Sequence, residues 1–283
     1  MLIDAHQHYW DPYAVEYPWM DPADATLYRR YGPDDVAPHL ARHGIDGTVL
    51  VQSADSDEDT ESMFAIAARE PHVRGVVAYV PLEDPQRVAD RLDVLTARAG
   101  FAGIRNLIHD RPEPDWLLQP AVLDGLRLLQ EADVAFDLVA VIPQHLEVLL
   151  RLREELPTLR IVIDHLGKPP FTDGPDAPWH RLIAEAALLP GVFAKLSGLY
   201  PPPDDGRPAD LRPWVDRALE LFGPERLMLG SDWPIAELAG GFDPVWTSLV
   251  SVVDTYEPAV ADQLRATTAL SFYGLSAGDG GNS

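Results

Sequence analysis

The sequence contains no cysteine. This absence excludes disulfides, cysteine zinc sites, iron–sulfur clusters and a thiol nucleophile. Any metal ion in this protein must therefore be held by histidine, aspartate or glutamate. Lysine is scarce as well: it occurs only at Lys168 and Lys195, both inside motifs that are described below.

Long apolar segments are also missing. No uncharged apolar run reaches the length of about 18 residues that a membrane span needs, and the first residues, MLIDAHQHYW, lack the basic stretch of a signal peptide. Acidic residues outnumber basic ones, so that the formal net charge is −23. Nucleic acids and anionic membranes require clustered Lys and Arg, and neither is an expected partner. We expect a soluble, cytoplasmic protein, and the sequence leaves open whether it forms a homo-oligomer.

Short apolar stretches typical of buried strands alternate with segments whose apolar residues lie three or four positions apart, as in amphipathic helices. The expected strands are 2–6, 47–52, 75–80, 102–107, 134–140, 160–166, 191–198 and 227–233. Strands of this kind joined through helices indicate a parallel sheet buried on both faces. The 283 residues suit one (β/α)₈ TIM barrel, a single α/β domain over 1–276 followed by a disordered tail, 277–283. An open doubly wound sheet is the alternative, but no G-x-G-x-x-G follows the first strand.

Histidine and aspartate side chains come at the ends of three expected strands. His6 and His8 form His-x-His at the end of the first, where the two-residue period of a strand points both rings to one side. His165 ends the sixth strand and Asp232 the eighth. The carboxyl ends of barrel strands surround one pocket, and three imidazoles with a carboxylate are ligands that zinc accepts. The four residues predict one shared site, and hydrogen-bonded core histidines are the alternative reading of His-x-His.

Seven motifs in a row cover almost the whole chain: IDAHQHYWDP, YPWM, GIRNLIHDRPEPDWLL, DLVA, VIDHLGKPP, KLSGLY and RLMLGSDWP. In this order they resemble the amidohydrolase superfamily, and within it the group of L-fuconolactonases, L-rhamnonolactonases and 2-pyrone-4,6-dicarboxylate lactonases. The resemblance implies a (β/α)₈ barrel with His6, His8 and His165 at the site and Asp232 as the catalytic aspartate. It also implies one divalent ion, zinc, on these four residues.

Two departures bear on the ion. Superfamily members rich in metal carry Lys or Glu on strand four and His on strand five, whereas this chain has Arg105 and Asn106 on strand four and Asp137 on strand five. A binuclear site is therefore not expected, and metal-free catalysis, in which the histidines hydrogen-bond the lactone carbonyl, stays open. Relatives often have His directly after the strand-four Arg, where this chain has Asn106 and then His109 three residues later.

Five further residues are candidates for substrate contact. Arg105 presents a fork of donors at a strand end, and Lys195 follows the apolar part of the seventh strand. Aromatic rings close to barrel loops can stack on a sugar or simply pack. The full set of predicted substrate-binding residues is Arg105, Lys195, His109, Trp10 and Trp233, with Trp19 as a further aromatic wall.

Other histidines are expected to have no role at the site. His39 and His43 are four residues apart on one helix face, but the Glu of H-E-x-x-H is absent, so they are interpreted as exposed helix residues. His72, His145 and His180 are expected to be structural or exposed.

The predicted reaction is hydrolysis of a small sugar lactone. Asp232 takes a proton from water while His165, His6 and His8, with or without an ion, polarise the carbonyl. An uncharged lactone is favoured over a dicarboxylate because only Arg105 is a clear cation at a strand end. A metal-dependent decarboxylase of the same superfamily and a non-catalytic sugar-binding barrel are the alternatives.

Overall fold

Eight parallel strands form one sheet whose order follows the chain, in a computed structural model that describes residues 1–172, 174, 176–200 and 210–276. The predicted tail 277–283 lies outside the described residues. The strands are β1 (Ile3–Gln7), β2 (Gly47–Val51), β3 (Val73–Ala78), β4 (Phe101–Arg105), β5 (Ala135–Leu138), β6 (Ile161–Ile163), β7 (Val192–Leu196) and β8 (Leu227–Leu229). The predicted (β/α)₈ barrel is confirmed, and the open doubly wound sheet is excluded by this strand order.

The last gap in the barrel closes between β1 and the turn after β8. Gln7 and Trp233 form a parallel bridge, and the backbone N–H of His8 donates to the carbonyl of Trp233 at 2.8 Å. The N–H of Asp232 donates to the carbonyl of His6 at 2.9 Å. The closing hydrogen bonds therefore involve four of the predicted site residues, His6, His8, Asp232 and Trp233.

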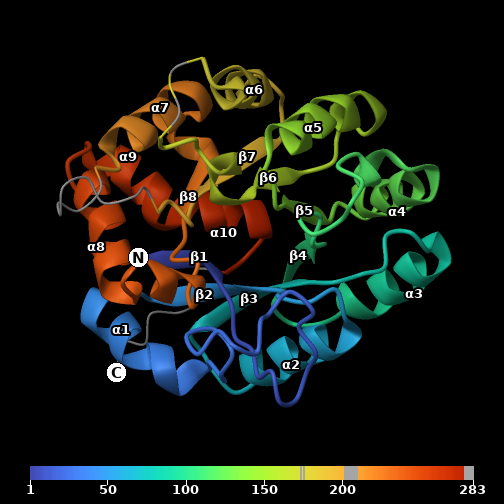
Figure 1. Ribbon diagram of the computed structural model, residues 1–283, viewed down its shortest axis with the longest axis horizontal. Helices are drawn as coiled ribbons and strands as arrows, with labels where there is room; N and C mark the ends of the chain where they lie inside the picture. The colour runs from blue at the N-terminus through green and yellow to red at the C-terminus, as the bar shows by residue number, and fades with distance from the viewer. Residues whose placement is uncertain (173, 175, 201–209, 277–283) are drawn as a thin grey trace.

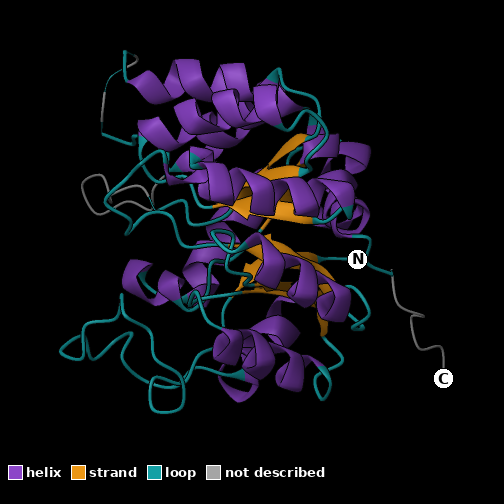
Figure 2. Cartoon of the chain, turned by 90° about the vertical axis from the view of Figure 1, so that its right-hand side faces the viewer, coloured by secondary structure: helices purple, strands orange, loops and turns teal. Residues whose placement is uncertain are grey.

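Helices surround the strands on the outside, as Figure 1 and Figure 2 show. Most begin with proline in their first turn, where the missing N–H needs no partner. The helices are α1 (Pro33–His43), α2 (Asp57–Ala67), α3 (Pro85–Leu95), α4 (Pro120–Glu131), α5 (Pro143–Glu155), α6 (Pro178–Ala187), α7 (Arg212–Phe222), α8 (Phe242–Val253), α9 (Pro258–Asp262) and α10 (Thr268–Tyr273). None of the described helices has the length and hydropathy to cross a lipid bilayer.

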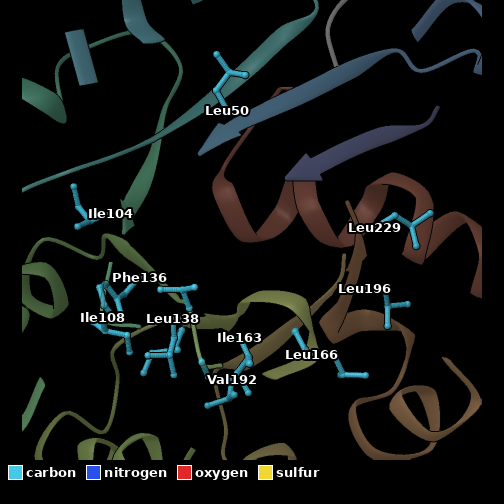
Figure 3. Close-up of a cluster of buried hydrophobic side chains, with 14 of the residues drawn as sticks. Leu50, Ile104, Ile108, Phe136, Leu138, Ile163, Leu166, Val192, Leu196 and Leu229 are labelled. Carbon is cyan, nitrogen blue, oxygen red and sulfur yellow. The ribbon is translucent and has the colours of Figure 1, made fainter. Parts of the chain in front are cut away.

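Two apolar layers fill the molecule. The larger one lies between strands and helices, and Figure 3 shows part of it, with Phe136 and Leu138 from β5 beside Ile163 from β6. The smaller one lies inside the barrel, where small residues such as Ala5 and Ala135 meet α10. In Figure 1, α10 (red) lies across the middle of the ring of strands. The C-terminal helix therefore closes one end of the barrel, and the site must open at the other.

An irregular pairing in β1 decides which side chains enter the site. Ile3 and Ala5 belong to the inner apolar layer, so strict alternation would point His6 away from it. The register with β2 shifts between Asp4 and Gln7, and such an irregularity re-aims the side chains that follow. His6 and His8 therefore face the interior above a floor of Ile3 and Ala5.

Candidate active site

His6 and His8 lie together at the carboxyl end of β1, as the His-x-His spacing predicted. Their Nε2 atoms are 3.2 Å apart, and both side chains are buried. The Nδ1 of His8 lies 2.7 Å from the carbonyl oxygen of Val51 at the end of β2. Because a carbonyl can only accept, this contact puts a proton on Nδ1 and leaves Nε2 of neutral His8 with a free lone pair.

His165 and Asp232 lie beyond the ends of their strands, which corrects the predicted positions. β6 ends at Ile163 and β8 at Leu229. Both residues adopt left-handed backbone conformations, with φ of 55° for His165 and 57° for Asp232. Such a conformation is unusual for a residue with a Cβ, and it turns each side chain back over the mouth of the barrel.

The carboxylate of Asp232 lies at the centre of the three imidazoles. Its Oδ1 is 3.5 Å from Nε2 of His8, 3.7 Å from Nε2 of His6 and 3.8 Å from Nε2 of His165. Its Oδ2 accepts a hydrogen bond from the hydroxyl of Tyr200 at 3.1 Å. Burial by itself raises the pKa of Asp232, but the adjacent His165 brings it well below its usual range. Asp232 is therefore an anion at neutral pH.

His6 and His165 are held as neutral rings. Burial lowers the pKa of His165 to about 3 in spite of the adjacent Asp232, and its Nδ1 is 2.9 Å from the hydroxyl of Ser197. Burial and the ammonium of Lys195 bring the pKa of His6 well below its usual range. Neutral imidazole nitrogen is the form that accepts a proton or binds a metal ion.

The donor set fits one divalent ion. A tetrahedral zinc site with bonds of about 2.0–2.1 Å has ligand atoms about 3.3 Å apart. The Nε2 atoms of His6 and His8 and Oδ1 of Asp232 are separated by 3.2, 3.5 and 3.7 Å. These three residues form one possible ligand group, and His6, Asp164 and His165 form another. The Nδ1 side of each ring has its own partner, which is the usual support of a histidine ligand.

Asp4 holds the two halves of the site together and was missed at the sequence level. Its Oδ1 accepts the backbone N–H of Ser231 at 2.8 Å and that of His6 at 3.2 Å. Its other oxygen accepts from the amide of Gln7 at 2.7 Å. Burial raises the pKa of Asp4 to about 6. The only signal in the sequence is its place two residues before His6.

A pocket of about 210 Å³ opens above the histidines and Asp232. Three of the predicted substrate-binding residues line it, namely Arg105, His109 and Trp10. The residues that line the pocket are His8, Trp10, Trp19, Ser53, Arg105, Leu107, His109, Val139, Val141, His165, Lys168, Asp232 and Ile235. The segments that follow β1 and β4 therefore reach the site, through Trp10, Trp19 and His109.

Lys168 lines the pocket, although it was not among the residues predicted from the sequence. It follows His165 by three residues in the motif VIDHLGKPP, and this spacing was the available signal. Among the described residues, its ammonium donates one hydrogen bond, to the carbonyl of Gly198 at 3.3 Å. Its remaining N–H groups can meet a ligand in the pocket.

Lys195 and Trp233 are not at the pocket, which corrects the expectation that they contact substrate. Lys195 is fully buried beneath it, because its ammonium pairs with Asp137 at 2.5 Å and Asp164 at 3.0 Å. Trp233 is buried against Tyr9 and Tyr31 and therefore serves packing.

Asn106 and the two histidines of α1, His39 and His43, lie apart from the site. The amide of Asn106 donates to the carbonyl of Val80 at 2.9 Å. His39 and His43 are only partly exposed, because both contact Oδ1 of Asp243, at 2.8 and 2.9 Å, where α1 meets α8. The expectation of solvent-exposed helix histidines therefore needs this correction.

Comparison with known proteins identifies relatives over most of the chain. The amidohydrolase family model matches residues 3–275. An L-fucono-1,5-lactonase of Burkholderia ambifaria is 39% identical over 244 residues, 85% of this chain and 82% of that protein. One from Burkholderia multivorans is 32% identical over 257 residues, 87% of this chain and 86% of that protein. A solved amidohydrolase of Burkholderia multivorans with bound zinc superposes with a TM-score of 0.89 at 29% identity, covering 98% of this chain and all of that one. The chain belongs to the amidohydrolase family.

Proposed function

We propose that this protein is a lactonase that opens a small sugar lactone, such as L-fucono-1,5-lactone, to the hydroxy acid. The observation that carries the proposal is the buried, ionised Asp232 on the floor of a small pocket, with three imidazoles around its carboxylate. The relatives named L-fucono-1,5-lactonase support the substrate class. The pocket suits one small molecule, because its volume is below the range usual for larger ligands.

We further propose that His6, His8, His165 and Asp232 hold one divalent ion, zinc. The spacing of three of these donor groups supports it, as does the zinc-bound structural neighbour. An ion at these residues supplies a Lewis acid beside the carboxylate of Asp232.

The reaction follows from the placement of the proton acceptor. Asp232 takes a proton from a water molecule, and the water oxygen attacks the carbonyl carbon of the lactone. The charge on the carbonyl oxygen is stabilised by the guanidinium of Arg105, which lines the pocket. The ring carbon–oxygen bond then breaks, and Asp232 returns the proton to the departing ring oxygen. The product is a hydroxy acid, which ionises and releases one proton at neutral pH.

A pH-indicator assay over aldono-1,4- and 1,5-lactones tests this reaction. We expect acid release from at least one lactone, loss of most of the rate after dialysis against a chelator, and recovery on addition of zinc. The Asp232→Asn protein is the control for spontaneous hydrolysis. Release of carbon dioxide from an aromatic acid without any acid release from lactones would instead assign a decarboxylase. Binding of lactones without turnover would assign a sugar-binding barrel.

Replacing Lys168 by Met tests its part in substrate binding. Lys168 lines the pocket, and loss of one charge-assisted hydrogen bond to the substrate should raise KM about tenfold with a smaller change in kcat. Lys168→Arg keeps the charge and should recover part of the affinity. Initial rates over a range of lactone concentrations measure both constants, and an unchanged KM in the Met variant would remove Lys168 from the substrate contacts.

A further inference from the structure

A buried charge cluster lies directly beneath His6 and takes no part in the proposed reaction. The ammonium of Lys195 is within hydrogen-bond distance of three acceptors: Oδ2 of Asp137 at 2.5 Å, Oδ1 of Asp164 at 3.0 Å and Nδ1 of His6 at 3.0 Å. The hydroxyl of Tyr273, on α10, donates to the same oxygen of Asp137 at 2.8 Å. We call these four residues, Lys195, Asp137, Asp164 and Tyr273, the ammonium cluster. Through Tyr273, the cluster connects α10 with the floor of the site.

The charges of the ammonium cluster sum to zero when the neighbouring Arg105 is included. Asp137 and Asp164 carry two negative charges, while Lys195 and Arg105 carry two positive ones, and Arg105 donates to Oδ2 of Asp164 at 3.1 Å. Buried charges are tolerated when they are paired in this way. The cluster therefore needs no charge on His6.

The Nδ1 atom of His6 faces both a donor and an acceptor. The ammonium of Lys195, at 3.0 Å, can only donate, and so favours a lone pair on Nδ1. The carboxylate of Asp164, whose Oδ1 is 3.3 Å away, can only accept, and so favours a proton there. The two neighbours therefore favour opposite tautomers of the neutral ring.

The Nε2 atom of His6 also faces both an acceptor and a donor. Nε2 of His8, 3.2 Å away, is an acceptor because the proton of His8 is on the side of Val51. The guanidinium of Arg105, at 3.4 Å, is a donor. At Nδ1 the contact with Lys195 is shorter than that with Asp164, and at Nε2 the contact with His8 is shorter than that with Arg105. Both of these shorter contacts favour the tautomer with the proton on Nε2. Two facing lone pairs at 3.2 Å would repel each other, whereas a cation between them would remove that repulsion.

We propose that Lys195 is a positioning residue that keeps the proton of His6 on Nε2 in the ion-free protein. When a divalent ion binds, the ring changes to the tautomer with its proton on Nδ1, and this N–H donates a hydrogen bond to Asp164. The ring carries one proton throughout. An ion needs the lone pair on Nε2, so binding must break the contact between Lys195 and Nδ1. Lys195 thereby opposes ion binding and Asp164 supports it. The inference rests on the proposed ion and is independent of the lactone.

Zinc affinity, measured against a competing chelator, tests whether Lys195 opposes ion binding. The variant Lys195→Met/Asp137→Asn removes one buried charge of each sign, so that Asp164 and Arg105 stay paired. We expect this variant to bind zinc about tenfold or more tightly than the wild type, within the range that groups behind a ligand exert. Ser197→Ala removes the hydroxyl partner of His165 without touching His6, and should leave the affinity equal or lower. Equal or weaker binding by the folded double variant would overturn the proposal.

Imidazole nitrogen spectra of the ¹⁵N-histidine protein give a second readout that needs no variant of the cluster. We expect His6, assigned by the loss of its signals in His6→Gln, to carry its proton on Nε2 without an ion and on Nδ1 in the presence of zinc. A proton on Nδ1 before zinc is added would refute the role of Lys195. Absence of zinc binding by the wild type would instead refute the proposed ion, and neither result depends on whether any lactone is hydrolysed.

Discussion

Asp232→Asn lowers kcat for the lactone by about 10²–10⁴-fold, the range that a positioned general base contributes. An amide cannot take the proton from water, and it replaces the anion among His6, His8 and His165 by a neutral group. The fold should persist, because the described contacts of this carboxylate are imidazoles and the hydroxyl of Tyr200, so that no buried Lys or Arg among them loses its partner. Initial rates and thermal unfolding of the variant and the wild type measure both effects.

Asp243→Asn is the matched control for this loss. Asp243 also contacts two histidines, His39 and His43, but where α1 meets α8, on the outside of the barrel. The same chemical change there should leave kcat and KM at their wild-type values. Near-normal turnover by Asp232→Asn would remove Asp232 from the role of base.

Gly198→Ala should lower activity by about 10²-fold, the cost of small displacements of reacting groups. A Cβ at this position would lie 2.5 Å from Nδ1 of His165 and 2.8 Å from Oδ2 of Asp232, closer than real contacts allow. Both side chains must move apart to make room. Overpacking of this kind also destabilises the fold by about 1–3 kcal/mol, which thermal unfolding would detect.

Gly44→Ala separates the clash from backbone strain. Gly44 has φ of 63°, close to the 56° of Gly198, but no described atom lies within 4 Å of its would-be Cβ. The substitution should cost about 1 kcal/mol through the left-handed conformation alone and leave activity unchanged. Wild-type turnover by Gly198→Ala would mean that the pocket absorbs the added methyl group without moving His165 or Asp232.

The residues that the sequence predicted best are those in long, strongly patterned segments. Eight apolar strands in alternation with amphipathic helices led to the barrel, because that pattern reflects burial on both faces of a parallel sheet. His6, His8, His165 and Asp232 were placed together because barrel strands end around one pocket. Arg105, His109 and Trp10 line this pocket as predicted, although their contacts with a substrate stay a prediction.

The positions of the Lys195 and Trp233 side chains could not be predicted from the sequence. Both lie near the ends of strands, and one-dimensional patterns do not distinguish a side chain that reaches the pocket from one buried beneath it. Lys195 is directed downward because Asp137 on β5 and Asp164, directly after β6, offer it carboxylates. Lys168 reaches the pocket because the chain turns sharply after β6, with positive φ at His165 and at Lys168 itself.

The sequence by itself determined the barrel and the identity of the four central residues, because burial and strand period act over short stretches of chain and leave a readable pattern. Only the tertiary structure decided how these residues face one another. The irregular pairing in β1 turns His6 and His8 inward, and Asp4 ties them to the turn that carries Asp232. The protonated nitrogen of each imidazole depends on donors and acceptors such as Val51 and Ser197, which belong to other strands or the turns that follow them. Contacts of this kind join residues far apart in the chain, and their geometry exists only once the barrel has closed.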